Sequence, residues 1–186
     1  MSWQIKKHTK IMQTAVFDVE EIHIEDTQLG RPLSHPYYRL HAADWINVVA
    51  QTTDGHLLLV KQMRAGSLKY TLETPGGVVD KNEQPLATAK RELEEETGFI
   101  SANWNYITDI SPNPAIMSNR LYIYCATDCY LNPQRQYFAD KNENIELIKI
   151  RPAQLDELLN TQNIFDNALS LLSYNLAKPQ LNKSCK

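Results

Sequence analysis

The sequence has little of what marks secreted, metal-knuckle or membrane proteins. Its three cysteines are an odd number without a Cys-x-x-Cys pair, so neither a disulfide framework nor a zinc knuckle is indicated. No stretch approaches the roughly 18 apolar residues that a membrane-spanning helix needs, and the N-terminus lacks the apolar run of a signal peptide. We therefore expect free thiols, a cytoplasmic location and no membrane partner.

Positive charge is not in excess either. The 186 residues carry 19 Lys and Arg against 22 Asp and Glu, which gives a formal net charge of −3. This balance provides no electrostatic footprint for a nucleic-acid polymer. A polyanionic small molecule is still compatible with it, because local basic residues or a metal ion can outweigh the net charge.

Length and pattern predict one globular domain with a small N-terminal extension. The first forty residues alternate apolar and polar positions, as in Ala15–Val19 and Ile22–Ile24, which is typical of half-buried antiparallel strands. A few short strands form no core alone, so they must pack on the main domain or on a second copy of the chain. We place the extension at residues 1–43 and the main domain at 44–186.

From Trp45 onward, strands and helices alternate, which predicts an α/β fold around one central sheet. One helix is marked at both ends, because Pro85 suits a first turn and Gly98 suits a C-terminal cap. The remaining segments are assigned by their periodicity. We expect strands at 46–50, 57–60, 121–126 and 145–150, a hairpin turn at 53–55, and helices at 82–97, 154–160 and 164–177.

The helix predicted at 82–97 carries the most informative residues. At about 100° per residue, Glu92 and Glu96 lie one turn apart beside the apolar stripe, and Glu95 lies next to them. Two carboxylates in that arrangement can share a hard divalent cation such as Mg²⁺. Without a cation they would repel each other and raise each other's pKa. The alternative is a solvated acidic helix face.

Spacing decides between these two interpretations. From Gly77 to Phe99 the chain fits Gly-x5-Glu-x7-Arg-Glu-apolar-x-Glu-Glu-x-Gly-apolar without a mismatch. This pattern resembles the Nudix box. The resemblance implies an α/β/α sandwich around a mixed sheet. It also implies hydrolysis of a nucleoside diphosphate linked to another moiety, by attack of water on the pyrophosphate.

The resemblance also implies roles for individual residues. In this family the box holds Mg²⁺, or Mn²⁺ as a substitute, on the pyrophosphate. By position, Glu92 and Glu96 would be the principal metal ligands, and Gly76 would add its backbone carbonyl. Arg91 would orient the catalytic glutamate Glu95 through an ion pair. Bound metal would neutralise phosphate charge and lower the pKa of a bound water.

Outside the box, the chain resembles the ADP-ribose and nucleotide-sugar pyrophosphatase branch of the family. Arg64 ends a Gln-x-Arg segment whose arginine contacts substrate phosphates, and Glu73 begins the segment before the box. Pro114 occupies the place of a proline associated with ADP-ribose pyrophosphatases. Alternatively, Pro112 and Pro114 simply make the loop a rigid turn. However, Ala115 and Asn119 replace the glycine and the acidic residue usual nearby, so the identity of the terminal sugar stays open.

The general base of this branch comes from a later loop, before the strand predicted at 145–150. Asp140, Glu143 and Glu146 are the carboxylates there, and we favour Glu143 because Glu146 falls within the strand pattern. Such a loop glutamate would otherwise be solvated or would bind an additional metal ion.

The N-terminal strands fit the same branch, whose members typically form homodimers by packing or exchanging such a segment. Arg39 and Trp45 are our candidates for contacting the nucleotide, since a guanidinium can reach phosphate and an indole can stack on a purine. Alternatively, Trp45 is a core residue and Arg39 a surface charge.

The predicted function is Mg²⁺-dependent hydrolysis of ADP-ribose or a related nucleoside diphosphate sugar, which yields a nucleoside monophosphate and a sugar phosphate. The alternative within the class is a GDP-mannose or other nucleotide-sugar pyrophosphatase. An alternative of another class is a non-catalytic domain that senses ADP-ribose, although the intact set of glutamates disfavours it. RNA decapping is disfavoured because basic patches interleaved with aromatic residues are missing.

Overall fold

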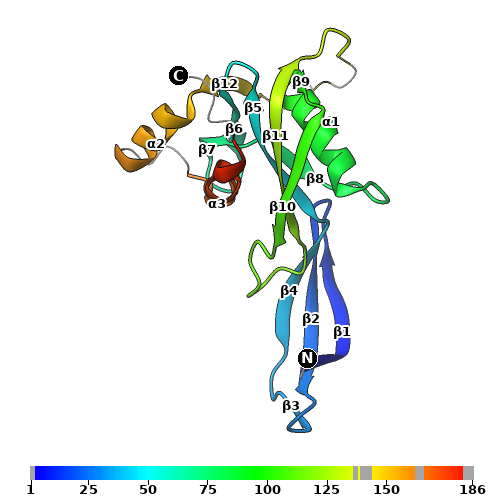
Figure 1. Ribbon diagram of the computed structural model, residues 1–186. Helices are drawn as coiled ribbons and strands as arrows, with labels where there is room; N and C mark the ends of the chain where they lie inside the picture. Colours follow the sequence, from blue (N-terminus) through cyan, green and yellow to red (C-terminus); the bar gives the residue numbers. More distant parts are fainter. Residues whose placement is uncertain (1–2, 136–137, 139–143, 162–165, 182–186) are drawn as a thin grey trace. The chain divides into compact units, whose positions relative to one another are not determined.

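The computed structural model describes residues 3–135, 138, 144–161 and 166–181 (Figure 1). The chain divides into two compact units. One comprises Met1–Asp44 together with Ile110–Arg120, and the other comprises Trp45–Asp109 together with Leu121–Lys186.

The first unit is an antiparallel sheet of the strands β1 (Trp3–Gln13), β2 (Phe17–Asp26), β3 (Arg31–Pro32) and β4 (Tyr37–Ala42). β2 pairs with each of the other three strands. Opposite charges face each other across β1 and β2, and Nζ of Lys6 lies 2.8 Å from Oε2 of Glu25. Such cross-strand pairs favour this register. The prediction of antiparallel N-terminal strands is confirmed.

The segment Ile110–Arg120 joins this first unit, which the sequence did not indicate. The N–H of Leu40 in β4 donates to the carbonyl of Ile116 at 2.7 Å, and the N–H of Ser118 donates to the carbonyl of Leu40 at 3.1 Å. These bonds extend the edge of the sheet along β4.

The first unit has almost no interior. Among its residues whose burial the structure describes, only Glu20 and Asn119 are buried, and neither is apolar. Every residue of β1 is exposed. Apolar side chains such as Trp3 and Ile11 are each about half exposed, at 51% and 54%. The sheet therefore lacks an apolar core of its own.

The second unit contains an eight-stranded mixed sheet in the order β10-β11-β5-β6-β12, with β7 beside β6, β8 beside β5 and β9 beside β11. β11 runs parallel to β5, and β6 runs antiparallel to both β5 and β12. The strands are β5 (Trp45–Thr52), β6 (Leu57–Arg64), β7 (Lys69–Glu73), β8 (Gly76–Val78), β9 (Phe99–Ile100), β10 (Asn103–Ile110), β11 (Leu121–Leu131) and β12 (Glu146–Ile150).

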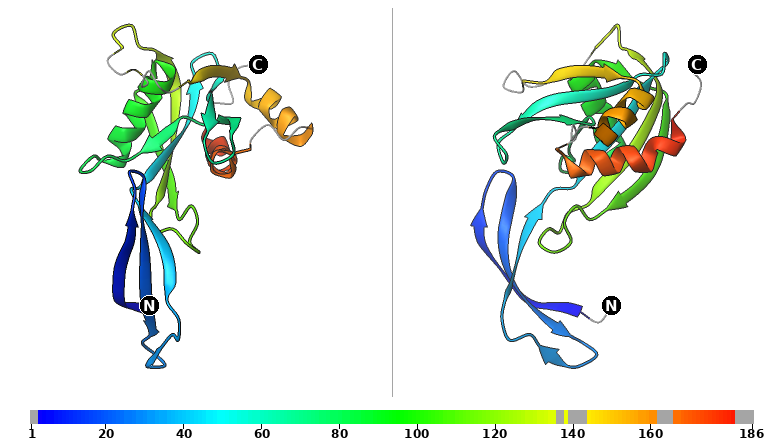
Figure 2. Two further views of the ribbon diagram at one scale, coloured as in Figure 1. Left: turned by 180° about the vertical axis from the view of Figure 1, so that it is seen from behind. Right: turned by 90° about the vertical axis from the view of Figure 1, so that its left-hand side faces the viewer.

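Helices cover both faces of this sheet, α1 on one face and α2 and α3 on the other (Figures 1 and 2). Successive side chains of a strand point to opposite faces. Accordingly, Val48 packs in a cluster with Leu93 of α1, whereas Val49 packs with Leu155 of α2 and Tyr174 of α3. The predicted α/β/α sandwich is confirmed. The helices are α1 (Pro85–Thr97), α2 (Pro152–Thr161), α3 (Ala168–Ala177) and the 3-10 turn η1 (Lys178–Gln180).

The ends of α1 follow its sequence signals, with one difference. Pro85 is in the first turn, and Gly98 ends the helix with φ +77° while its N–H bonds to the carbonyl of Glu94 at 2.8 Å. The helix begins three residues later than the predicted Asn82. Asn82 has φ +71°, a left-handed conformation that cannot belong to a right-handed helix.

The other predicted elements lie close to their expected ranges, whereas β7, β8, β9 and β10 were not predicted. The turn before β6 contains Gly55 with φ +83°, and it joins β5 and β6 as the predicted hairpin. The side chain of Asn167 caps α3 by accepting bonds from the backbone N–H groups of Leu169 and Ser170. Part of the helix predicted at 164–177 lies outside the described residues. Within the described part of the chain, no helix is long and apolar enough to cross a bilayer.

Candidate active site

Two glycines in β8 allow the chain before α1 to lie close to β5. Gly76 and Gly77 pair with Asn47 and Ile46 of β5. A Cβ atom on Gly76 would lie 2.5 Å from the carbonyl oxygen of Ile46, which is backbone and cannot move aside. Only glycine fits this position without displacing a strand.

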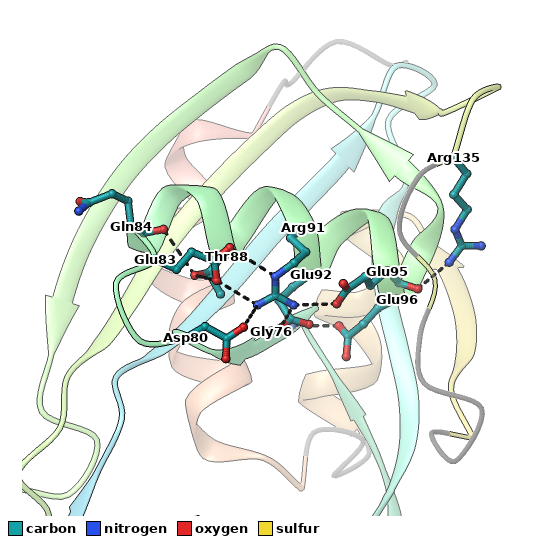
Figure 3. Close-up of polar contacts among 10 residues, drawn as sticks. All are labelled: Gly76, Asp80, Glu83, Gln84, Thr88, Arg91, Glu92, Glu95, Glu96 and Arg135. Carbon is teal, nitrogen blue, oxygen red and sulfur yellow. Dashed lines mark hydrogen bonds and ion pairs between the residues drawn. The ribbon is translucent and has the colours of Figure 1, made fainter.

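Gly77 makes room for a carboxylate of α1. A Cβ atom on Gly77 would lie closer than 3.0 Å to the whole carboxylate of Glu92. One helical turn later, Oε2 of Glu96 accepts a hydrogen bond from the N–H of Gly76 at 3.0 Å (Figure 3). The fold thus brings both predicted metal ligands to the two-glycine segment.

Arg91 connects the glutamates around it (Figure 3). Its Nη1 donates to Oε1 of Glu92 at 2.9 Å and to Oε2 of Glu95 at 2.8 Å, while Nη2 donates to Oε2 of Glu83 at 3.2 Å. Burial alone would lower the pKa of Arg91, but the bond to Glu83 and the charges of Glu92 and Glu95 raise it above its ordinary value. Arg91 is therefore permanently charged, and it forms an ion pair with Glu95.

Glu83 fixes the other side of the guanidinium. It lies just before α1, and its Oε2 also accepts a bond from the hydroxyl of Thr88 at 2.8 Å. Burial would raise the pKa of Glu83, but the bonds from Arg91 and Thr88 outweigh burial and lower it. Glu83 is thus an ionised anchor that orients Arg91.

The donor set around Gly77 suits a hard divalent cation, although the carboxylates do not converge on one point. Among the described residues, no group of three or more His, Cys, Asp or Glu side chains is arranged to hold a metal ion. Glu92 and Glu95 contact Arg91 instead. Carboxylate oxygens are nevertheless the ligands such cations prefer, and the absence of a Cβ on Gly77 lets the Glu92 carboxylate lie against the two-glycine segment. Glu92 and Glu96 are the residues that would hold the ion.

Arg64 and Glu73 form a second charged group on β6 and β7. Nε and Nη2 of Arg64 donate to the two carboxylate oxygens of Glu73 at 2.8 and 2.7 Å, and the hydroxyl of Thr71 donates to the same carboxylate. Glu73 is only 3% exposed, whereas the Arg64 side chain is 48% exposed. Burial raises the pKa of Glu73, but Arg64 and Thr71 outweigh it and hold the pKa below 4.5. Glu73 thus fixes the guanidinium in one orientation.

The structure places the other predicted site residues in different parts of the chain. Arg39 lies in β4 of the first unit, where its Nε donates to the buried Glu20 at 2.6 Å. Pro114 is exposed in the segment Ile110–Arg120. Trp45 begins β5 in the second unit and is half-buried. Glu143 lies outside the described residues.

The sequence did not indicate that the chain following β11 contacts α1. Nη2 of Arg135, which follows β11, donates to the backbone carbonyl of Glu95 at 2.6 Å (Figure 3). A bond from a loop arginine to a distant backbone oxygen has no signature in the sequence, because any residue can supply the carbonyl. Only the fold brings the two together.

Known proteins are similar to this chain in fold and in sequence. A solved structure described as an ADP compounds hydrolase superposes with a TM-score of 0.80 over 97% of this chain and 94% of that one, at 23% identity. The ADP-ribose pyrophosphatase of Bacillus subtilis (strain 168) is 25% identical over 148 residues, 80% of each chain. The ADP compounds hydrolase NudE of Escherichia coli (strain K12) is 26% identical over 121 residues, 64% of this chain and 63% of that one.

The protein is an α/β/α sandwich around a mixed sheet, and the glutamates of its helix α1 face the two-glycine segment of β8. The family model of the NUDIX domain matches residues 41–169, which is more than half of the chain. This chain therefore belongs to the Nudix family, as its box predicted.

The glycine pair offers a test of the site that separates folding from cation binding. We expect Gly77→Ala to leave the urea midpoint near that of the wild type, because the clashing Glu92 carboxylate is the end of a flexible side chain. Displacing Glu92 should weaken Mg²⁺ binding, measured by calorimetry, about 10–100-fold.

Gly66→Ala is the matched control, since nothing lies within 4 Å of its added Cβ. Gly76→Ala should instead lower the midpoint, because its Cβ meets backbone. Wild-type Mg²⁺ affinity in Gly77→Ala would show that Glu92 does not bind the cation.

The Arg64–Glu73 pair predicts a pH-dependent loss of stability. Because the pKa of Glu73 is lowered on folding, its carboxylate stabilises the fold above pH 4.5, and this contribution disappears as pH falls through the folded pKa. Glu73→Gln should cost about 1–2 kcal/mol at pH 7, in the range for a charged hydrogen bond to a partly exposed partner. The difference should shrink below pH 4.5.

Urea unfolding at pH 7 and pH 4 measures this difference. Glu146→Gln is the matched control, because its ion pair with Lys61 is exposed and should contribute less than about 0.5 kcal/mol. If the loss of unfolding free energy in Glu73→Gln stayed constant down to pH 4, it would contradict the stabilisation of the fold by an ionised Glu73.

Proposed function

We propose that this protein hydrolyses the pyrophosphate of ADP-ribose or a related nucleoside diphosphate sugar in the presence of Mg²⁺. The products would be a nucleoside monophosphate and a sugar phosphate. The observation that carries the proposal is the row of glutamates on α1, oriented by Arg91 and facing Gly76 and Gly77. The names of the Bacillus subtilis and Escherichia coli relatives support ADP-linked substrates.

Each side chain of α1 has a separate part in this proposal. Glu92 and Glu96 hold the divalent cation, with the Gly76 carbonyl as a further ligand, and Arg91 keeps Glu95 oriented. When bound, Mg²⁺ neutralises phosphate charge and lowers the pKa of a bound water. The ion pairs of Arg91 support these roles, because they fix the carboxylates of Glu92 and Glu95 before any ligand binds.

Substrate phosphates would be recognised by Arg64. A guanidinium is a planar, multidentate donor for phosphate oxygens. Glu73 binds two of its nitrogens and so sets the direction of the exposed remainder of the side chain. Arg39, Trp45 and Pro114 are the further residues that we propose for binding the nucleotide or the sugar.

We also propose that the protein is a homodimer formed through the N-terminal sheet. The sheet has no apolar interior among the residues whose burial is described, and β1 is exposed throughout. A second copy would cover side chains such as Trp3 and Ile11. The buried free thiols of Cys125 and Cys129 agree with a cytoplasmic location.

A substrate panel tests the reaction. Phosphate release, after coupled phosphatase treatment, should be strongest with ADP-ribose among ADP-ribose, ADP-glucose and GDP-mannose. It should require Mg²⁺ and stop with chelator. Glu96→Gln should lower turnover at least about 100-fold, because it removes a metal ligand.

Glu157→Gln in α2 is the control, since this glutamate is exposed on another helix. Strongest turnover of GDP-mannose would favour the other nucleotide-sugar pyrophosphatases. Binding of ADP-ribose without turnover would favour a sensing domain.

The proposed general base is tested separately. Glu143→Gln should lower kcat by far more than it raises KM, because a base acts in the transition state. A decrease in kcat within about twofold, equivalent to less than ~0.5 kcal/mol in the barrier, would show that Glu143 is not the base. Glu146→Gln is the paired variant, and a larger loss there would assign the role to Glu146.

A further inference from the structure

The carboxylate helix has an unfavourable charge distribution at its C-terminal end. The carbonyl end of a helix carries partial negative charge, so cations stabilise it and carboxylates destabilise it. The last turn of α1 contains no basic residue. Four of its final six residues are glutamates: Glu92, Glu94, Glu95 and Glu96.

The chain that follows β11 supplies the missing donors. Nη2 of Arg135 donates to the carbonyl of Glu95 at 2.6 Å (Figure 3). Nδ2 of Asn132 donates to Oε1 of Glu94 at 2.8 Å, and the N–H of Asn132 donates to the carbonyl of Gly98 at 2.9 Å. These three bonds fasten the end of α1 to the end of β11.

Arg135 donates a hydrogen bond to a carbonyl that has no backbone N–H partner within the helix. The last four carbonyls of an α-helix have no partner within it. The cap at Gly98 satisfies Glu94, whose carbonyl receives the Gly98 N–H at 2.8 Å. The next carbonyl, that of Glu95, receives Arg135. A Cβ on Gly98 would lie 3.4 Å from Nη1 of Arg135, so the guanidinium lies directly against the cap.

The same turn is also bound by the two-glycine segment, through the bond from the Gly76 N–H to Glu96. Glu96 therefore keeps its place over Gly76 only while the last turn of α1 stays wound. Arg135 secures that turn with a charge-assisted bond, which is roughly twice as strong as a neutral one.

We propose that Arg135 is a positioning residue for the hydrolysis, acting through the backbone of Glu95 to hold Glu95 and Glu96 in place. This role rests on the proposed function. Because the contact is to backbone, Arg135 needs no contact with substrate or cation, and its effect should reach the reaction through the geometry of α1.

Amide hydrogen exchange tests, without metal or substrate, whether the bond from Arg135 to the Glu95 carbonyl holds the last turn of α1. Arg135→Ala should speed exchange in a peptide covering residues 93–99 at least about fivefold, by fraying the last turn. Arg135→Lys should restore most of the protection, since an ammonium can also donate to the carbonyl. Lys90→Ala is the matched control, because Lys90 is an exposed cation on the same helix. Unchanged exchange in Arg135→Ala would overturn the proposal.

Kinetics test the positioning role. Arg135→Ala should lower kcat about tenfold and raise the Mg²⁺ concentration for half-maximal activity, with KM for ADP-ribose within about twofold. Arg135→Lys should recover most of both losses. A merely structural effect would lower kcat equally at every Mg²⁺ concentration, in proportion to the folded fraction, and would overturn the role.

The two proposals fail in different ways. If the wild-type protein turned over no nucleotide sugar while Arg135→Ala still speeded exchange in residues 93–99, the proposed function would be overturned. The stabilisation of the last turn by Arg135 would be supported. If the wild type were active and Arg135→Ala matched it in both exchange and Mg²⁺ response, only the role of Arg135 would be overturned.

Discussion

The ion pairs of Arg91 are the interaction on which the site depends. Glu83, Glu92 and Glu95 surround one guanidinium, and all of these side chains are largely buried, with exposures between 14% and 22%. Three carboxylates at such short distances would repel one another strongly where water is partly excluded. A permanently charged arginine in their midst offsets that repulsion, so α1 can fold without a metal ion and still carry the carboxylates that we propose as ligands of one.

The parts of the fold that bury apolar side chains were predictable from sequence. Ala89 and Leu93 repeat at helical spacing, and both are fully buried in α1. Leu86, which precedes Ala89 by three residues and so has the same helical spacing, lies in the first turn of the helix and is 37% exposed. β1 was not predicted as a strand of its own. All its residues are exposed, and a strand without a buried face need not alternate apolar and polar residues.

The site was predictable where spacing alone places residues, as with Glu92 and Glu96 on one helix face. It was not predictable where one side chain meets a distant partner. Thr74 is an example: its N–H and its hydroxyl both donate to the hydroxyl oxygen of the buried Ser170 in α3, each at 3.2 Å. Such a pair cannot be recognised until α3 is docked.

The parallel pairing of β11 with β5 has a consequence for how the chain reaches this structure. Leu121 pairs with Trp45 at the centre of the sheet, so segments separated by β6, α1 and β10 must meet before the core is complete. Contacts between distant segments form slowly. During synthesis α1 leaves the ribosome well before β11 does. Its apolar stripe, Ala89 and Leu93, is therefore incompletely covered until Tyr124, Ala126 and Cys129 of β11 join the same cluster. Apolar surface left exposed in this interval favours aggregation and binding by chaperones.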